Sequence, residues 1–301
     1  MIQFIINPAS GGGQALQIWK DLEKQLIREK VSYKAFVTEK AGDAARFASQ
    51  LSNGVLAVVG GDGTTNEILS GLKNPKDILL GIIPVGSGND GARGLSLPRD
   101  PLTALKNILH PSKIISVDIG EIFAGGQSRK FLVSSGIGFD ASICHKALSS
   151  RLKVFLNHFH LGKLTYAGIA LKEILFSKPR TLFVTLDDGT EKTFENCWIM
   201  AFMNLPSEGG GFYFAPKASP SDGLLDIAII HDVSRFKLLR LLPSAMKGRH
   251  TKAKGADFLS CKAVTVCAKT PLPLHSDGEN AGTGREATIT LHPKYLRLIS
   301  A

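Results

Sequence analysis

The chain has 301 residues, of which 44% are hydrophobic and 21% charged, and its formal net charge is +10. This composition excludes a disordered or fibrous protein, and the length allows one large domain or two of ordinary size. No apolar run approaches the roughly 20 residues that span a bilayer, and the N-terminus has no basic leader or cleavage site. We therefore expect a soluble, cytoplasmic protein.

Residues 1–121 alternate short β-branched runs with longer amphipathic segments. The expected strands are 4–6, 33–37, 55–59 and 80–85, and the expected helices are 15–30, 43–51 and 66–71. This alternation predicts an α/β nucleotide-binding domain with a largely parallel sheet.

From residue 114 onward, strand-like runs separated by turn signals dominate. The expected strands are 117–123, 130–135, 181–186, 195–203, 224–230 and 263–268, and only 142–176 and 235–247 have a helical pattern. The pattern predicts a β-rich, sandwich-like second domain over residues 122–287. The closing segment 288–301 is again strand-like and can join either domain.

Three glycine-rich turns, 7–13, 60–66 and 86–90, directly follow predicted strands of the first domain. In an open α/β sheet, ligands bind where the carboxyl ends of the strands meet. Glycines let backbone N–H groups approach an anion closely, and hydroxyls and helix N-termini add further donors. One such loop alone is most simply a tight turn, whereas three around one crevice indicate phosphate binding.

A simple turn does not explain Asp62, because an acid among phosphate-binding glycines repels the ligand unless a metal intervenes. Phosphoryl transfer uses Mg²⁺, which a carboxylate holds directly or through water. We therefore assign Asp62, and also Asp90, to electrostatic work at a metal–nucleotide site.

Two other nucleotide motifs are excluded. Gly86, Gly88 and Gly91 have the GxGxxG spacing, but no acidic residue follows at about 20 residues to hold a ribose. The chain also lacks a GxxxxGK[ST] run, so it is not a P-loop enzyme.

Four segments together carry a resemblance to a known family. They are Asn7-Pro8 with the glycine turn at 11–13, Thr38 before 42–44, the GGDGT run at 60–64 and the GSGND run at 86–90. In order and spacing they resemble the diacylglycerol kinase catalytic family, which includes bacterial lipid kinases and sphingosine kinases. The match runs over nearly the whole chain, although GGDGT alone is shared with phosphofructokinases and NAD kinases.

The resemblance implies where ATP would bind. The implied positions are Asn7, Ser10, Gly11, Gly12, Gly13, Thr38, Gly60, Gly61, Asp62, Gly63, Thr64, Thr65, Asn66, Ser87, Asn89 and Asp90. The family usually has a bulky apolar residue after Asn-Asp, whereas this chain has Gly91, so we expect a locally altered helix start there.

The second domain carries the run SDGLLD at residues 221–226, which resembles the family's second conserved block. The resemblance implies a structural Mg²⁺ held by the Asp222 carboxylate and the carbonyls of Ser219 and Leu224, with waters completing its shell. An Asp-Gly turn before a strand, without metal, is the alternative.

The run HSDGE at residues 275–279 matches the family's DGE signature. A hydroxyl that attacks ATP is helped by a carboxylate that accepts its proton. The resemblance implies Glu279 as the proton acceptor and Asp277 as its close partner; which of the two transfers the proton stays open. The alternative for Asp277-Gly278 is an ordinary type I′ hairpin turn.

Two basic segments, 145–163 and 235–254, are candidates for contact with an anionic membrane, because apolar residues interleave with lysines and arginines. The alternative is that the apolar residues pack into the core and the lysines form a solvated face. Nucleic acid is not expected as a partner, because no recognition motif accompanies the charge.

These features predict an ATP- and Mg²⁺-dependent lipid kinase that phosphorylates the hydroxyl of diacylglycerol or a related lipid. It would be peripheral to the membrane during catalysis, and a homodimer is one option for its assembly. The alternatives are an NAD kinase-like GGDGT enzyme and a non-catalytic lipid-binding protein. We expect Asp62→Ala and Glu279→Ala to leave folded but nearly inactive proteins.

Overall fold

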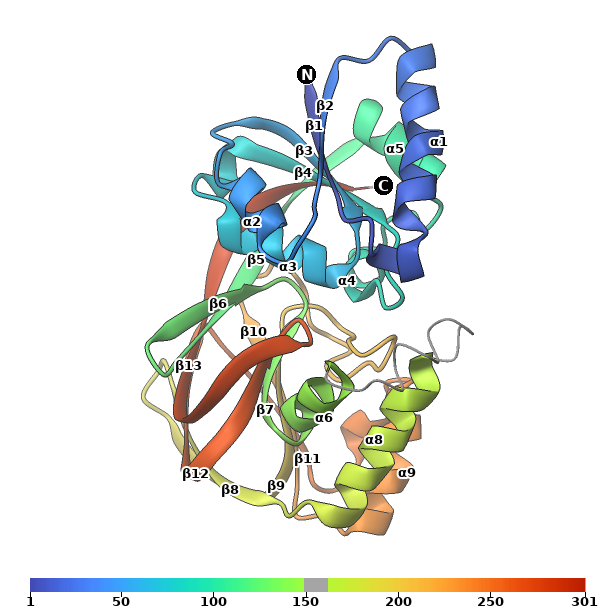
Figure 1. Cartoon of the computed structure of the whole chain (residues 1–301). Coiled ribbons are helices and arrows are strands. Elements are labelled where there is room, and N and C mark those ends of the chain that lie inside the picture. The colour runs from blue at the N-terminus through green and yellow to red at the C-terminus, as the bar shows by residue number, and fades with distance from the viewer. Residues whose placement is uncertain (149–161, 301) are drawn as a thin grey trace. The chain divides into compact units, whose positions relative to one another are not determined.

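The computed structural model describes residues 1–148 and 162–300, which form two compact units (Figure 1). Unit 1 comprises Met1–Ile119 with the closing segment from Pro293, and unit 2 comprises Gly120–His292. The expected two-domain architecture is confirmed. Within the described residues, no helix has the length and apolar character needed to cross a membrane.

Unit 1 contains a sheet with the order β13-β4-β3-β1-β2. Its strands are β1 (Ile2–Ile6), β2 (Tyr33–Val37), β3 (Gly54–Gly60), β4 (Ile78–Pro84) and the last part of β13 (Glu279–Ser300). Each neighbouring pair runs parallel, with Ile6 beside Val37 and Val59, and Leu298 beside Leu80. The nearly continuous apolar run of β3 is typical of a strand buried on both faces.

Helices cover the sheet of unit 1 on both faces (Figure 1). On one face lie α1 (Ala15–Arg28) and α5 (Pro101–Leu109), whose apolar residues share a core with the strands. In α1 that apolar stripe is Ala15, Trp19, Leu22 and Leu26, all buried, at the spacing of one helix face. The other face carries α2 (Asp43–Ala48) and α3 (Asp62–Gly71), which contact each other. Shorter elements are η1 (Ser10–Gly13), η2 (Pro75–Asp77) and α4 (Asp90–Gly94).

Unit 2 is built on antiparallel strands with the order β11-β10-β9-β7-β12-β13. A hairpin of β5 and β6 joins β13, and β8 pairs with both β9 and β12. The strands enclose a core of Phe131, Phe202, Val266 and Leu274 with their neighbours. Their bounds are β5 (Lys113–Ala124), β6 (Gln127–Phe131), β7 (Ser134–Gly138), β8 (Arg180–Leu186), β9 (Glu191–Met203), β10 (Leu225–His231), β11 (Ala256–Cys261) and β12 (Ala263–Ser276).

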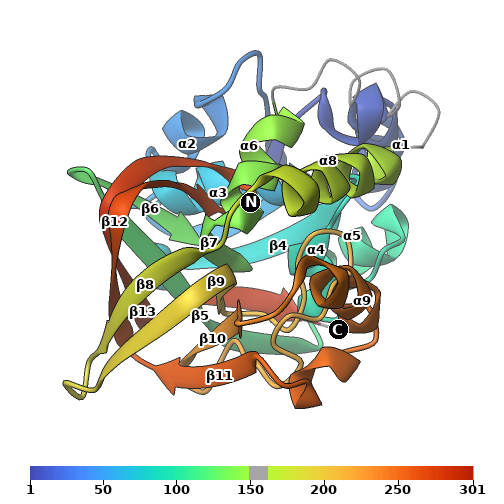
Figure 2. The same cartoon turned by 90° about the horizontal axis from the view of Figure 1, so that it is seen from below.

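Among its described residues, unit 2 has three helices that pack against these strands (Figure 2): α6 (Phe139–Leu148), α8 (Gly162–Phe176) and α9 (Arg235–Ala245), with η3 (Arg249–Lys252) following. Contacts join α8 to both α6 and α9. Trp198 of β9 lies in a second core cluster with Ile174 of α8 and Leu238 of α9. The helical pattern expected over 142–176 thus corresponds to α6 and α8, while 149–161 lie outside the described residues.

Candidate phosphate-binding and catalytic sites

The three glycine loops of unit 1 meet at the carboxyl end of its sheet. The Asn7 amide donates a hydrogen bond of 2.9 Å to the Thr64 hydroxyl, which joins the first loop to the second. Gly61 and Gly86 approach so closely that a side chain on Gly86 would lie 2.7 Å from the Gly61 Cα atom. These contacts require glycine for space, and they gather the loops around one site, as their positions after parallel strands predict.

Asp62, the acid of the GGDGT run, holds the third loop in place. Its two carboxylate oxygens accept hydrogen bonds from the backbone N–H groups of Asp90 (3.0 Å) and Gly91 (2.9 Å). These donors open α4, which begins after Asn89 in the left-handed conformation (φ 51°). The residue at position 91 therefore donates through its backbone, and the absence of a bulky side chain there leaves this contact intact.

Asp90 is almost completely buried and forms an ion pair with Arg93. Arg93 also donates to the Gly88 carbonyl. The guanidinium therefore compensates the Asp90 charge inside the loop. Asp62 has the better geometry of the two carboxylates for meeting a metal, because each of its oxygens keeps a lone pair beyond the one backbone bond it accepts.

The segment after β2 joins the same end of the sheet. Thr38 is buried, and its N–H donates to the Ile6 carbonyl at 2.9 Å. Asp43 accepts the N–H groups of Glu39 and Lys40, and the Glu67 carboxylate of α3 accepts the Gly42 N–H. The hydrogen bond from Glu39, with that from Arg46, lowers the pKa of Asp43 and keeps it ionised.

The remaining predicted nucleotide positions differ in how open they are to a ligand. The Cβ positions of Gly12 and Gly13 face open space, and Ser87 is exposed. Thr65 and Asn66 of α3 are buried, and the Thr65 hydroxyl donates to the Gly61 carbonyl at 3.2 Å. The Asn89 Oδ1 atom is buried and finds no donor within the described residues. Such an orphaned acceptor in one of the glycine loops fits a polar ligand such as a nucleotide.

In unit 2, Asp277 and Gly278 form the tight turn between β12 and β13. Both have positive φ (49° and 79°), and Ser276 and Glu279 pair across the turn. The hairpin geometry expected as the alternative is therefore present. Asp277 does more than turn the chain: its carboxylate accepts the N–H groups of Leu132 (2.9 Å), Val133 (2.8 Å) and Ser134 (3.1 Å). This explains why the strand expected over 130–135 is interrupted between β6 and β7.

Glu279, two residues later, contrasts with Asp277. It is half-buried, and its carboxylate has no hydrogen bond or ion pair with any described residue. A carboxylate that accepts three backbone N–H groups is a poor base, because protonation would break those bonds. Of the two acids of the DGE run, Glu279 is thus the one whose carboxylate is not engaged by a described residue.

A buried cluster behind this turn was not anticipated from the sequence. The ligand atoms of Asp140, Glu208 and His275 lie within 4.8 Å of one another. His275 Nε2 contacts Asp140 at 3.2 Å, and the Gly278 N–H points to His275 Nδ1 at 3.3 Å. Burial alone would lower the pKa of His275, but the bond and charge of Asp140, with the charges of Glu208 and Asp277, raise it. One imidazole and two carboxylates form a donor set that can hold a divalent cation.

The residues predicted for a structural metal lie in an exposed loop before β10. Asp222 Oδ1 accepts the Leu224 N–H at 3.0 Å in a local turn. Asp222 and Leu224 are exposed, and Ser219 is half-buried. The second Asp222 oxygen remains open to solvent, so this loop can also provide an acidic ligand, and the assignment to Ser219, Asp222 and Leu224 stays a prediction.

The structure describes the second of the two basic segments proposed for membrane contact in full, but only part of the first. In the first, residues 149–161 lie outside the described residues, and Lys146 pairs with Glu173. In the second, Lys237 donates to the Lys254 carbonyl, while Phe236 is 82% exposed. The second segment therefore presents both cationic and apolar groups to solvent.

Two family profiles match the chain, one in each half. The profile described as diacylglycerol kinase catalytic domain matches residues 1–122, and the one described as YegS C-terminal NAD kinase beta sandwich-like domain matches residues 134–300. YtlR of Bacillus subtilis, provisionally named a lipid kinase, is 35% identical over 290 residues, covering 93% of each chain. The chain belongs to the diacylglycerol kinase catalytic family.

Further relatives agree with this membership. A diacylglycerol kinase of Mycobacterium tuberculosis is 33% identical over 282 residues, covering 92% of this chain and 88% of its own. A crystal structure of a diacylglycerol kinase from Bacillus anthracis superposes with a TM-score of 0.74 at 19% identity, covering 100% of this chain and 96% of its own, which shows a shared fold. Membership of this family supports the assignment of this protein as a kinase, and it implies that ATP is used.

Proposed function

We propose that the protein is an ATP- and Mg²⁺-dependent lipid kinase that phosphorylates the hydroxyl of diacylglycerol or a related lipid. The observation that carries the proposal is the convergence of the three glycine loops in unit 1, tied together by Asn7–Thr64 and by Asp62. Family membership supports the same reaction class. The acceptor is inferred from the names of the relatives.

The loops of unit 1 would hold the nucleotide. Gly12, Gly13 and the first turn of α3 offer backbone donors to phosphate oxygens. Asn89 offers its unpaired Oδ1 to a donor group of the ligand. Mg²⁺, when bound, neutralises phosphate charge during transfer, and Asp62, which lies among the loops, would be the carboxylate that meets it.

Glu279 would accept the proton of the lipid hydroxyl, and Asp277 would position it by fixing the turn. Asp277 anchors the turn to the start of β7 through three backbone bonds. That anchoring limits where the Glu279 side chain can point. Positioned general bases contribute typically 10²–10⁴-fold to rate.

We also propose that the substrate is reached at an anionic membrane surface. Phe236 and Met246 are 82% and 54% exposed, and the lysines and arginines of α9 and η3 lie beside them in the sequence. Apolar groups flanked by cations suit the boundary between head groups and acyl chains. Equal binding to neutral and anionic liposomes, unaffected by salt, would argue against this surface.

The decisive experiment is Mg²⁺-dependent transfer from γ-labelled ATP into a panel of lipids in mixed micelles. Wild type is compared with Glu279→Gln and with Glu195→Gln, an exposed glutamate of β9 in the same unit. A labelled phospholipid made by wild type and Glu195→Gln, but barely by Glu279→Gln, supports the proposal. Labelling of NAD or a sugar phosphate, with no lipid product, refutes it.

A further inference from the structure

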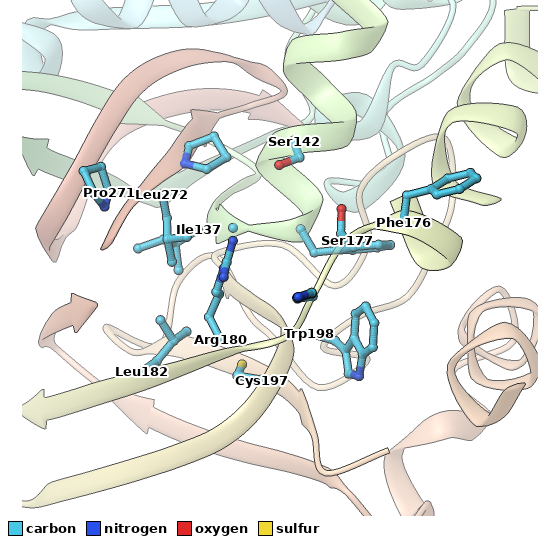
Figure 3. A pocket seen from close by; sticks show the side chains of 14 residues that line it. Ile137, Ser142, Phe176, Ser177, Arg180, Leu182, Cys197, Trp198, Pro271 and Leu272 are labelled. Carbon is cyan, nitrogen blue, oxygen red and sulfur yellow. The ribbon is translucent and has the colours of Figure 1, made fainter. Parts of the chain in front are cut away.

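A cavity of about 420 Å³ opens in unit 2 where two strands change partners (Figure 3). On one side, β9 pairs with β8 as far as Cys197 and with β7 from Ile199 onward. On the other, β12 pairs with β8 as far as Ala268 and with β7 from Leu274 onward. The ladder is therefore open between β7 and β8, and this gap forms the cavity. Its volume lies in the range of about 300–1,000 Å³ that small-molecule sites occupy.

The inner walls of the cavity are apolar. Ile137, Leu182, Leu272 and Trp198 line it, and each is at most 5% exposed. Burial raises the pKa of the Cys197 thiol, so this lining group also stays neutral. This apolar part of the wall suits a hydrocarbon chain, whereas the polar part of the lining is made by Ser142, Ser177, Lys178 and Arg180.

Two cations lie at the rim of the same cavity. Lys178, which precedes β8, and Arg180, its first residue, both line the cavity and are both exposed. Neither has a hydrogen bond or ion pair with a described residue, and none of the described lining residues is acidic. Figure 3 shows the Arg180 side chain pointing into the cavity. Two cations that no described residue neutralises, next to an apolar wall, match a ligand with an apolar tail and a negative head.

The surroundings of the cavity favour a ligand that comes from a bilayer. Phe176, which lines the cavity, is 76% exposed, and Leu171 and Leu175 of the same helix are 47% and 49% exposed. Leu171 and Leu175 are four residues apart, so they lie on one face of α8. A chain leaving a membrane would meet this apolar face before entering the cavity.

We propose that this cavity binds the hydrocarbon chain of an anionic amphiphile, with Arg180 and Lys178 pairing with its negative head group. The proposal names a ligand class for unit 2 and holds whichever lipid is phosphorylated. It therefore stands or falls separately from the kinase reaction, and it is tested without ATP.

The test compares two amphiphiles that share one chain and differ in charge. Oleoyl lysophosphatidic acid and monoolein, each below its critical micelle concentration, are titrated into the full-length protein. Binding is followed by tryptophan fluorescence, because Trp198 lines the cavity and Trp19, in unit 1, gives a constant background. We expect the anionic ligand to bind about tenfold more tightly, as one well-formed charge pair would provide.

Three variants decide the outcome. The Arg180→Gln/Lys178→Gln double variant should lose the preference for the anionic ligand, whereas Lys192→Gln, an exposed cation of β9 outside the lining, should keep it. Ser142→Phe, which fills the cavity from α6, should weaken both ligands. Equal wild-type affinities, an anionic preference that survives the double variant, or unchanged binding of both ligands by Ser142→Phe would overturn the proposal. Thermal unfolding of each variant shows that it is folded.

Discussion

The GGDGT run of unit 1 and the HSDGE run of unit 2 each contain an aspartate, Asp62 and Asp277, whose carboxylate accepts backbone N–H groups from a segment distant in sequence. In unit 1, Asp62 accepts backbone N–H groups 28 and 29 residues away. In unit 2, Asp277 accepts N–H groups 143 to 145 residues away. Both carboxylates fasten a remote segment to a loop. The comparison teaches that an acid in a signature can build the site as well as act in it.

Asp277→Ala should have the largest effect on stability. It leaves the N–H groups of Leu132, Val133 and Ser134 without their acceptor, and these three residues are at most 3% exposed. Because each orphaned buried donor costs about 1–3 kcal/mol, we expect unfolding free energy to fall by about 3 kcal/mol or more. Urea denaturation measures this loss, and a change within about 0.5 kcal/mol would show that the anchoring is unimportant.

Glu279→Gln tests the contrast between Asp277, which holds the turn in place, and Glu279 in the same turn. Its carboxylate is bonded to no described residue, so the change should leave stability within about 0.5 kcal/mol of wild type. Lipid phosphorylation should fall about 10²–10⁴-fold, the contribution of a general base. Steady-state kinetics beside a denaturation curve separates the two effects. Glu195→Gln supplies the matched loss of charge, and full activity in Glu279→Gln would return the role of base to Asp277.

Asp62→Asn should have an intermediate effect on stability. An amide can accept only through Oδ1, so one of the N–H groups of Asp90 and Gly91 loses its acceptor. We expect a loss of about 1–3 kcal/mol together with weaker nucleotide binding. The prediction of a folded but nearly inactive Asp62 variant therefore gains an expected loss of stability. Calorimetric titration with ATP and denaturation would check both effects, and unchanged stability would contradict the anchoring role.

Much of the fold could be predicted from local sequence patterns. The glycine turns after apolar strands and the buried apolar face of α1 each depend on residues that are close together in the sequence. Other elements had signals that were overlooked. At the start of α5, for example, the Asp100 side chain accepts the Thr103 N–H at 2.8 Å, and Pro101 occupies the first turn.

The long-range features of unit 2 could not be predicted in this way. Asp140 and His275 are 135 residues apart in the sequence, and their pairing depends on β7 lying beside β12. The cavity likewise arises where β9 and β12 change partners, which strand propensities do not encode. The sequence does show Asp140 after a glycine-containing strand and His275 before Asp277-Gly278, but neither position predicts which residue the side chain contacts.

Acid should weaken unit 2 through His250, and this is the smallest effect. His250 is 2% exposed, and its buried Nδ1 has no hydrogen-bond partner in the part of the chain that the structure describes. Burial lowers the pKa of His250, although the bond to the Phe214 carbonyl acts in the opposite direction. His250 therefore binds a proton more readily in the unfolded chain than in the folded protein. The unfolding free energy consequently falls as the pH drops below about 6.5. His275 acts in the opposite sense, because its pKa is raised. The measurement is thus the difference in unfolding free energy between wild type and His250→Gln at several pH values. That difference should shrink or reverse on acidification, and a constant difference from pH 5 to 8 would show that His250 titrates normally.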